Sequence, residues 1–126
     1  MKKVSFVIPC YRSENTLEGV ILEIKEAMNK LGKYTYEVIL INDSSPDNTW
    51  KTIERLSGEN ENIIGVNFSK NFGQHAALMA GMRETTGDYV VCLDDDGQTP
   101  ANEVDKLLSA LEEGADAVYA RYGNKK

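Results

Sequence analysis

The sequence is poor in the residues that build disulfide frameworks, collagen-like repeats or metal knuckles. Its 126 residues include only 2 Cys, 3 Pro and 1 His. Cys10 and Cys92 each stand at the end of an apolar run, and their spacing fits neither a metal knuckle nor a redox pair. We therefore expect both to be reduced, buried, small hydrophobic side chains of a cytosolic protein.

Long apolar runs and an excess of positive charge are also absent. No stretch approaches the roughly 18 apolar residues of a membrane span, and the N-terminus lacks a signal-peptide core. The net charge of −6 disfavours a general electrostatic grip on nucleic acid or on an anionic membrane. We expect no nucleic-acid partner, and an anionic ligand would need a local device such as a metal ion.

The motifs of several common enzyme classes are missing as well. The sequence has no Gly-x-Ser-x-Gly elbow, no recognisable Cys/His pairing, and no Gly-rich loop of the dinucleotide or P-loop type. Once these classes are set aside, binding of a phosphate group through a metal ion is the chemistry that remains.

What is present is an alternation of β-rich apolar runs with helical patterns. Strands are predicted at residues 4–8, 37–41, 63–68, 89–93 and, more weakly, 115–119. Helices are predicted at residues 17–31, 45–58, 74–86 and 99–113. This order predicts one α/β domain over residues 1–126, built on an open, mostly parallel sheet with helices on both faces.

The predicted helices carry their own start and stop signals. Ser45-Pro46 and Thr99-Pro100 each offer a capping residue followed by a proline at the first helical position, and Gly58 is expected to stop the second helix. The 74–86 helix is apolar nearly all round, so we expect it to be buried.

Polar residues gather directly after the first four predicted strands, in the runs 9–11, 42–45, 69–73 and 94–98. Ligands of an open α/β sheet bind beyond the carboxyl ends of its strands. The sequence therefore predicts a ligand site at that edge.

Three adjacent carboxylates close the fourth predicted strand. Such a run needs a compensating cation, because like charges repel and burial disfavours ionisation. In an extended stretch Asp94 and Asp96 face one way and Asp95 the other, while Gln98 continues the alternation with a neutral oxygen. Mg²⁺ or Mn²⁺ suits these ligands. The alternative is a solvated acidic turn that caps the following helix.

Asp43 and Asn42 follow the second predicted strand. Asp43 can accept hydrogen bonds from a base N–H, or it can close an Asx-turn before Ser45. A purely structural role remains open for Asn42.

The other edge residues each have two interpretations. The stretch from Pro9 to Tyr11 breaks the first strand. An aromatic ring there can flank a nucleotide base or ribose; alternatively, these residues only form a turn and pack into the core. Lys70 can contact a phosphate near the N-terminus of the third helix, or it is a surface lysine. For His75 a structural or capping role is favoured.

Four ordered blocks together resemble the signature of the family 2 glycosyltransferases. They are VIPCY at 7–11, INDSSPDNT at 41–49, NFGQH at 71–75 and DDDGQ at 94–98. The last two look most like the branch that transfers sugars to polyprenyl phosphates such as dolichol and undecaprenyl phosphate. Departures from that branch occur at Arg12-Ser13, Asn42 and Gly97.

The resemblance implies a GT-A fold, a UDP- or GDP-sugar donor, a divalent metal and inversion at the anomeric carbon. It implies a role in cell-wall or polysaccharide biosynthesis. It assigns the Asp-x-Asp metal motif to Asp94 and Asp96, with Gln98 beside the metal. It assigns base contact to Asp43 and the donor loop to Pro9 and Tyr11. Asp95, in the middle of the motif, is grouped with Lys70 among the donor-binding residues.

Members of that branch continue well past residues 121–122 into acceptor-binding elements and often transmembrane helices. We therefore expect a domain truncated at its C-terminus. In the full-length form, membrane contact at the inner face and a lipid-phosphate acceptor would involve segments absent here. The alternatives are a non-catalytic nucleotide-sugar-binding module and, less favoured, a metal-dependent nucleotidyltransferase or a phosphoacceptor receiver domain.

Overall fold

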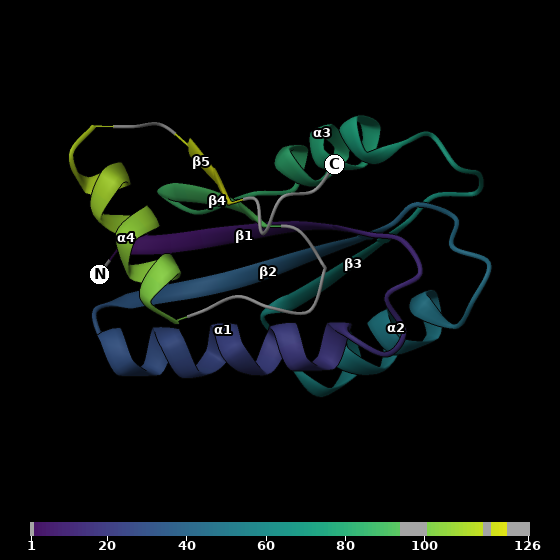
Figure 1. The fold of residues 1–126 in the computed structure, drawn as a ribbon, viewed down its shortest axis with the longest axis horizontal. Coiled ribbons are helices and arrows are strands. Elements are labelled where there is room, and N and C mark those ends of the chain that lie inside the picture. Colours follow the sequence, from purple (N-terminus) through teal and green to yellow (C-terminus); the bar gives the residue numbers. More distant parts are fainter. Residues whose placement is uncertain (1, 94–100, 115–116, 121–126) are drawn as a thin grey trace.

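The computed structural model describes residues 2–93, 101–114 and 117–120. Its elements are β1 (Lys2–Cys10), α1 (Leu17–Leu31), β2 (Tyr34–Asn42), α2 (Thr49–Glu59), β3 (Ile63–Asn67), α3 (Gln74–Arg83), β4 (Tyr89–Leu93), α4 (Ala101–Glu112) and β5 (Ala117–Ala120). The strands form one five-stranded sheet in the order β3-β2-β1-β4-β5 (Figure 1). Every neighbouring pair is parallel, which confirms the predicted open α/β sheet.

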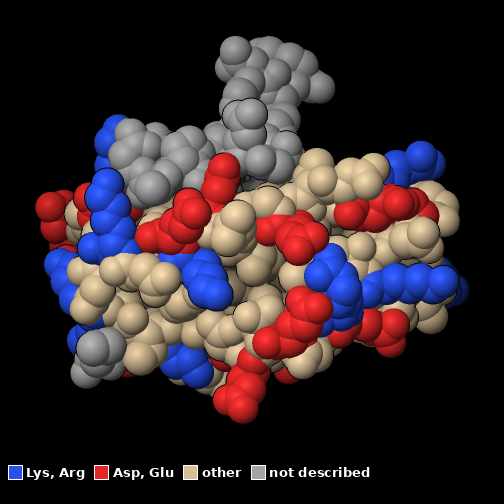
Figure 2. All heavy atoms as spheres, turned by 90° about the horizontal axis from the view of Figure 1, so that it is seen from below, with Lys and Arg blue, Asp and Glu red and all other residues tan. Residues whose placement is uncertain are grey.

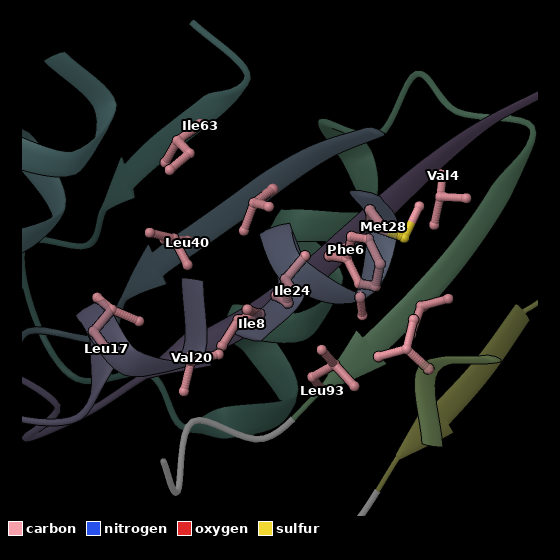
Figure 3. Close-up of a cluster of buried hydrophobic side chains, with 14 of the residues drawn as sticks. Val4, Phe6, Ile8, Leu17, Val20, Ile24, Met28, Leu40, Ile63 and Leu93 are labelled. Atoms are coloured by element: carbon pink, nitrogen blue, oxygen red, sulfur yellow. The ribbon is translucent and has the colours of Figure 1, made fainter. Parts of the chain in front are cut away.

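The sheet is covered on both faces, but unequally. Val4, Phe6 and Ile8 alternate along β1 and point to the face that α1, α2 and α4 cover. Figure 3 shows the side chains of this larger cluster, which include Val4, Phe6, Ile8, Leu17, Val20, Ile24, Met28, Leu40, Ile63 and Leu93. On the opposite face, α3 packs on a smaller cluster that contains Val7, Ile39, Ile41, Ala77 and Cys92.

Both cysteines are buried thiols, as predicted. The Cys10 thiol donates a hydrogen bond to the carbonyl oxygen of Ile8 at 3.3 Å. Burial raises the pKa of Cys92 to about 11, so this thiol stays protonated near neutral pH.

The predicted start of α2 is wrong. The helix begins at Thr49 and not at Ser45-Pro46. The Ser45 hydroxyl does not cap a helix there: it donates to Asp47 Oδ1 and accepts the N–H of Arg12. At the other end Gly58 does not stop the helix, which reaches Glu59. Asn60 follows, and its side-chain amide donates to the carbonyl oxygen of Leu56 at 3.0 Å.

The third helix is shorter and more exposed than predicted. It ends at Arg83, and beyond it the N–H of Thr86 donates to Glu37 at 2.7 Å. Ala77 and Gly81 face the sheet, whereas Met79 and Met82 are 46% and 36% exposed. The expectation of a buried helix was wrong because, among the described helices, α3 is the one that packs on its face of the sheet, so its outer side faces solvent. The predicted cap at Thr99-Pro100 lies outside the described residues.

Glu37 anchors the connection between α3 and β4 at the amino edge of the sheet. It is 4% exposed and accepts hydrogen bonds from Ser5 Oγ at 2.6 Å and from the N–H of Thr86. Lys3 Nζ lies 3.5 Å away. Burial alone would raise the pKa of Glu37, but the hydrogen bonds and the Lys3 cation outweigh it and lower the pKa.

The surface over α1 and α2 mixes the two signs of charge. Figure 2, seen from below, shows acidic and basic side chains interspersed across this face. Arg55 of α2, for example, pairs with Glu18 of α1 at 3.1 Å and with Glu59 at 3.4 Å. None of the helices in the described ranges is long and apolar enough to cross a membrane.

Gly81 sets the distance between α3 and the sheet. A Cβ added there would lie 2.5 Å from both Ile41 Cδ1 and Val7 Cγ1. We predict that Gly81→Ala lowers the free energy of unfolding by about 1–3 kcal/mol through overpacking, measured by urea denaturation. Gly58→Ala is the matched control: a Cβ there meets nothing within 4 Å, so it should stabilise by about 0.5–1 kcal/mol. Equal gains from both variants would contradict this packing.

Candidate functional site

Three loops meet at the carboxyl edge of the sheet because three strands end in one row. Cys10 pairs with Asn42, and Asn42 pairs with Asn67. The N–H of Asp43 donates to the carbonyl oxygen of Cys10 at 3.1 Å, and Asn42 Nδ2 donates to Asn67 Oδ1 at 2.8 Å. The polar runs predicted to converge after β1, β2 and β3 therefore lie side by side.

Asp43 joins the end of β2 to the start of α3. Its side chain is 4% exposed, and its two oxygens accept hydrogen bonds from the N–H groups of Phe72 at 2.8 Å and Gly73 at 3.0 Å. Gly73 has a φ of 97°, which favours glycine. The carboxylate thus lies at the positive end of the α3 dipole. Each carboxylate oxygen has a second lone pair, so Asp43 can still accept from a ligand.

Asn42 has the structural role that the sequence left open. Its Oδ1 accepts a hydrogen bond from the N–H of Ser45 at 3.2 Å. The turn before Ser45 is therefore closed by Asn42 and not by Asp43.

The loop after β1 presents an aromatic ring at this edge. Tyr11 is 43% exposed, and the Arg12 guanidinium lies 5.5 Å from its ring centroid. Arg12 has a φ of 55°, a left-handed conformation that is uncommon outside glycine. The strand ends within the predicted stretch 9–11: Pro9 is still buried within β1, and the break falls after Cys10.

The loop before α3 contributes an exposed cation and an exposed ring. Lys70 Nζ lies 6.0 Å from the ring centroid of Phe72, which is 56% exposed and meets Phe68 edge-to-face. His75 is exposed in the first turn of α3. The side chain that binds backbone N–H groups at the start of this helix is Asp43.

Asp47, for which the sequence predicted no role, lies in the loop after β2. Its Oδ1 accepts hydrogen bonds from the hydroxyls of Ser45 and Thr49 and from the N–H of Thr49. Partial burial alone would raise the pKa of Asp47, but these donors outweigh it and lower the pKa to about 2. The signal available in the sequence was an Asp two residues after Ser45 and two before Thr49, ahead of a helix.

The acidic run follows β4 in the sequence. Leu93, the last residue of β4, is fully buried, and β4 lies between β1 and β5. Asp94, Asp95, Asp96 and Gln98 follow it and lie outside the described residues. Within the described ranges, no group of three or more His, Cys, Asp or Glu residues could hold a metal ion. The carboxylate and amide oxygens of the run are the hard donors that Mg²⁺ and Mn²⁺ take.

Comparison with known proteins agrees with this arrangement. The family model described as Glycosyl transferase family 2 matches residues 5–126. The glucosyl-3-phosphoglycerate synthase of Mycobacterium tuberculosis, solved with phosphoglyceric acid, is 26% identical with a TM-score of 0.69, over 90% of this chain and 40% of its own.

Two further structures share the fold at lower identity. The mannosyltransferase PcManGT from Pyrobaculum calidifontis, in complex with GDP-Man and Mn²⁺, is 24% identical with a TM-score of 0.64, over 75% of this chain and 28% of its own. S. aureus TarS 1-349 in complex with UDP is 18% identical with a TM-score of 0.69, over 88% and 32%. This chain thus spans well under half the length of these structures.

The contacts of Asp43 predict a local effect of its removal. Asp43→Ala leaves the N–H groups of Phe72 and Gly73 without their acceptor, which should cost about 1–3 kcal/mol in the free energy of unfolding. Amide hydrogen exchange at Phe72 and Gly73 should accelerate. Asp88→Ala is the control, because Asp88 accepts from the N–H of Lys3 at the opposite edge. Unchanged exchange at Phe72 and Gly73 in Asp43→Ala would refute the assignment.

Proposed function

Because this chain belongs to glycosyl transferase family 2, we propose that it forms the nucleotide-sugar-binding part of a glycosyltransferase. The reaction proposed is transfer of a sugar from a UDP- or GDP-sugar to an acceptor, with inversion at the anomeric carbon. The observation behind this proposal is that Tyr11 and Asp43 lie at the carboxyl edge of the sheet, where β4 also ends, and that the acidic run follows β4 in the sequence. Structures that share the fold were solved with GDP-Man, UDP or UDP-GlcNAc.

Within this proposal the loops after β1, β2 and β3 bind the donor nucleotide. Asp43 accepts a base N–H through the lone pairs that Phe72 and Gly73 leave available. The exposed ring of Tyr11 flanks the base or ribose, with Pro9 shaping the strand end beside it. Lys70 supplies a positive charge for a phosphate near the N-terminus of α3.

Asp94, Asp96 and Gln98 would hold a divalent cation, Mg²⁺ or Mn²⁺, and Asp95 would face the donor. When bound, such a cation neutralises the charge that develops on the departing nucleotide diphosphate. The fit rests on the chemistry of the oxygen ligands and on their position directly after a buried strand.

For the acceptor we propose a polyprenyl phosphate. The support is the likeness of NFGQH at 71–75 and DDDGQ at 94–98 to that branch of the family. A phosphate acceptor is already anionic, so its attack on the anomeric carbon needs no strong general base. The transition state should resemble an oxocarbenium ion.

Calorimetric titration with UDP and GDP, with and without Mn²⁺, tests the donor site. We predict binding of one nucleotide that strengthens with Mn²⁺, and at least about tenfold weaker Mn²⁺-dependent binding in Asp96→Ala. Asp105→Ala is the matched control, because Asp105 is exposed on α4. A nucleotide affinity that changes neither with Mn²⁺ nor in Asp96→Ala would contradict the metal assignment. Binding without donor hydrolysis or transfer would favour the alternative, a non-catalytic binding module.

A further inference from the structure

Side-chain hydrogen bonds join the loop after β1 (residues 11–16) to the loop after β2 (residues 43–48) and to the first residue of α2. The N–H of Arg12 donates to Ser45 Oγ at 2.8 Å, and the N–H of Ser13 donates to Thr49 Oγ1 at 2.8 Å. In the reverse direction, the N–H of Asn48 donates to Glu14 Oε1 at 3.0 Å. Two hydroxyl groups therefore receive consecutive backbone N–H groups of the loop after β1.

Asp47 determines which way these two hydroxyl groups point. An ionised carboxylate only accepts hydrogen bonds, so Ser45 and Thr49 must donate their protons to Asp47 Oδ1. Their lone pairs are then left to accept the N–H groups of Arg12 and Ser13. A single carboxylate oxygen thus orients both acceptors that hold the loop.

The loop after β1 would not adopt its observed backbone conformation by local preference. Arg12 and Ser44, one in each loop, both have a φ of 55°, which is disfavoured for residues with a Cβ. Ser13 is 1% exposed, while Tyr11, two residues earlier, is 43% exposed. The hydrogen bonds at Arg12 and Ser13 therefore fix the backbone directly after the exposed Tyr11, which itself follows the last residue of β1.

We propose that Asp47 is a positioning residue of the donor site: through Ser45 and Thr49 it holds the loop after β1, and with it Tyr11, beside Asp43. Asp47 itself does not touch the donor in this arrangement. The inference rests on the proposed function, because the loop matters for binding only if Tyr11 flanks the nucleotide.

Hydrogen exchange tests the anchoring without reference to any ligand. In Asp47→Ala the amides of Arg12 and Ser13 should exchange at least about tenfold faster than in the wild type, because their acceptors lose orientation. Asp105→Ala, an identical change on the exposed side of α4, should leave them unaffected. Wild-type exchange at both amides in a folded Asp47→Ala protein would overturn the anchoring.

Two substitutions at Thr49 distinguish the effect of losing its hydroxyl from the effect of disturbing the fold. Thr49→Val keeps the shape of this fully buried side chain but removes the hydroxyl, whereas Thr49→Ser keeps the hydroxyl. Exchange at Ser13 should accelerate in the valine variant and stay near wild type in the serine variant. Ser45→Ala, at a partly exposed site, makes the equivalent test for Arg12 if Thr49→Val does not fold.

Titration with UDP and GDP in the presence of Mn²⁺ supplies the functional arm. Kd should rise at least about tenfold in Asp47→Ala and Thr49→Val, and stay near wild type in Thr49→Ser and Asp105→Ala. Unchanged Kd in a folded Asp47→Ala protein with accelerated exchange would overturn the positioning role. Failure of the wild-type chain to bind either nucleotide would overturn the donor-site role with the proposed function, while the exchange result would still decide the anchoring.

Discussion

The parallel pairing of β1 with β2 is the interaction on which the rest of the structure depends. The two strands run side by side from Lys2 and Tyr34 to Cys10 and Asn42, and their apolar residues are buried on both faces. Burial of a large aliphatic side chain contributes roughly 1.5–3 kcal/mol, and a shift of one residue would exchange the two faces. The register therefore fixes where both strands end, and with it which loops become neighbours.

Hydrogen-bond acceptors on side chains then hold the loops that follow these neighbouring strand ends. Asp43 holds the loop before α3 through Phe72 and Gly73, and Asp47 holds the loop after β1 through Ser45 and Thr49. Loop backbone has no ladder partners of its own, so the Asp43 carboxylate and the hydroxyls of Ser45 and Thr49 accept its N–H groups. The residues assigned to the donor and the residues that shape the loops are thus interleaved in one short stretch after β2.

The sheet could be predicted from the sequence because its signals are local and repeated. Buried strands of a parallel sheet read as continuous apolar runs, and the helix at 17–31 carries a clear apolar stripe that ends at Gly32. The start of α2 could not be predicted in this way. Ser45-Pro46 looks like a helix cap, but the Ser45 hydroxyl donates to Asp47 and accepts the backbone N–H of Arg12 from another loop.

The convergence of the polar runs after β1, β2 and β3 could be predicted from the sequence, but the hydrogen bonds that join them could not. The sequence places polar residues after each strand, which suffices to locate the edge. The bonds of Asp43 to residues 29 and 30 positions later depend on the packing of α3, which only the folded chain shows. The exposure of Met79 and Met82 could not be predicted for the same reason. The sequence of a helix does not show which other elements will pack against it.

Mapping a bound nucleotide by amide chemical shifts tests the central claim most directly. On addition of UDP or GDP with Mg²⁺, we predict the largest changes at Tyr11, Asp43 and Phe72, at the carboxyl edge of the sheet. Residues of the amino edge, such as Lys3 and Thr86, should be unaffected. Changes concentrated at the amino edge or on the exposed face of α1 would contradict the account.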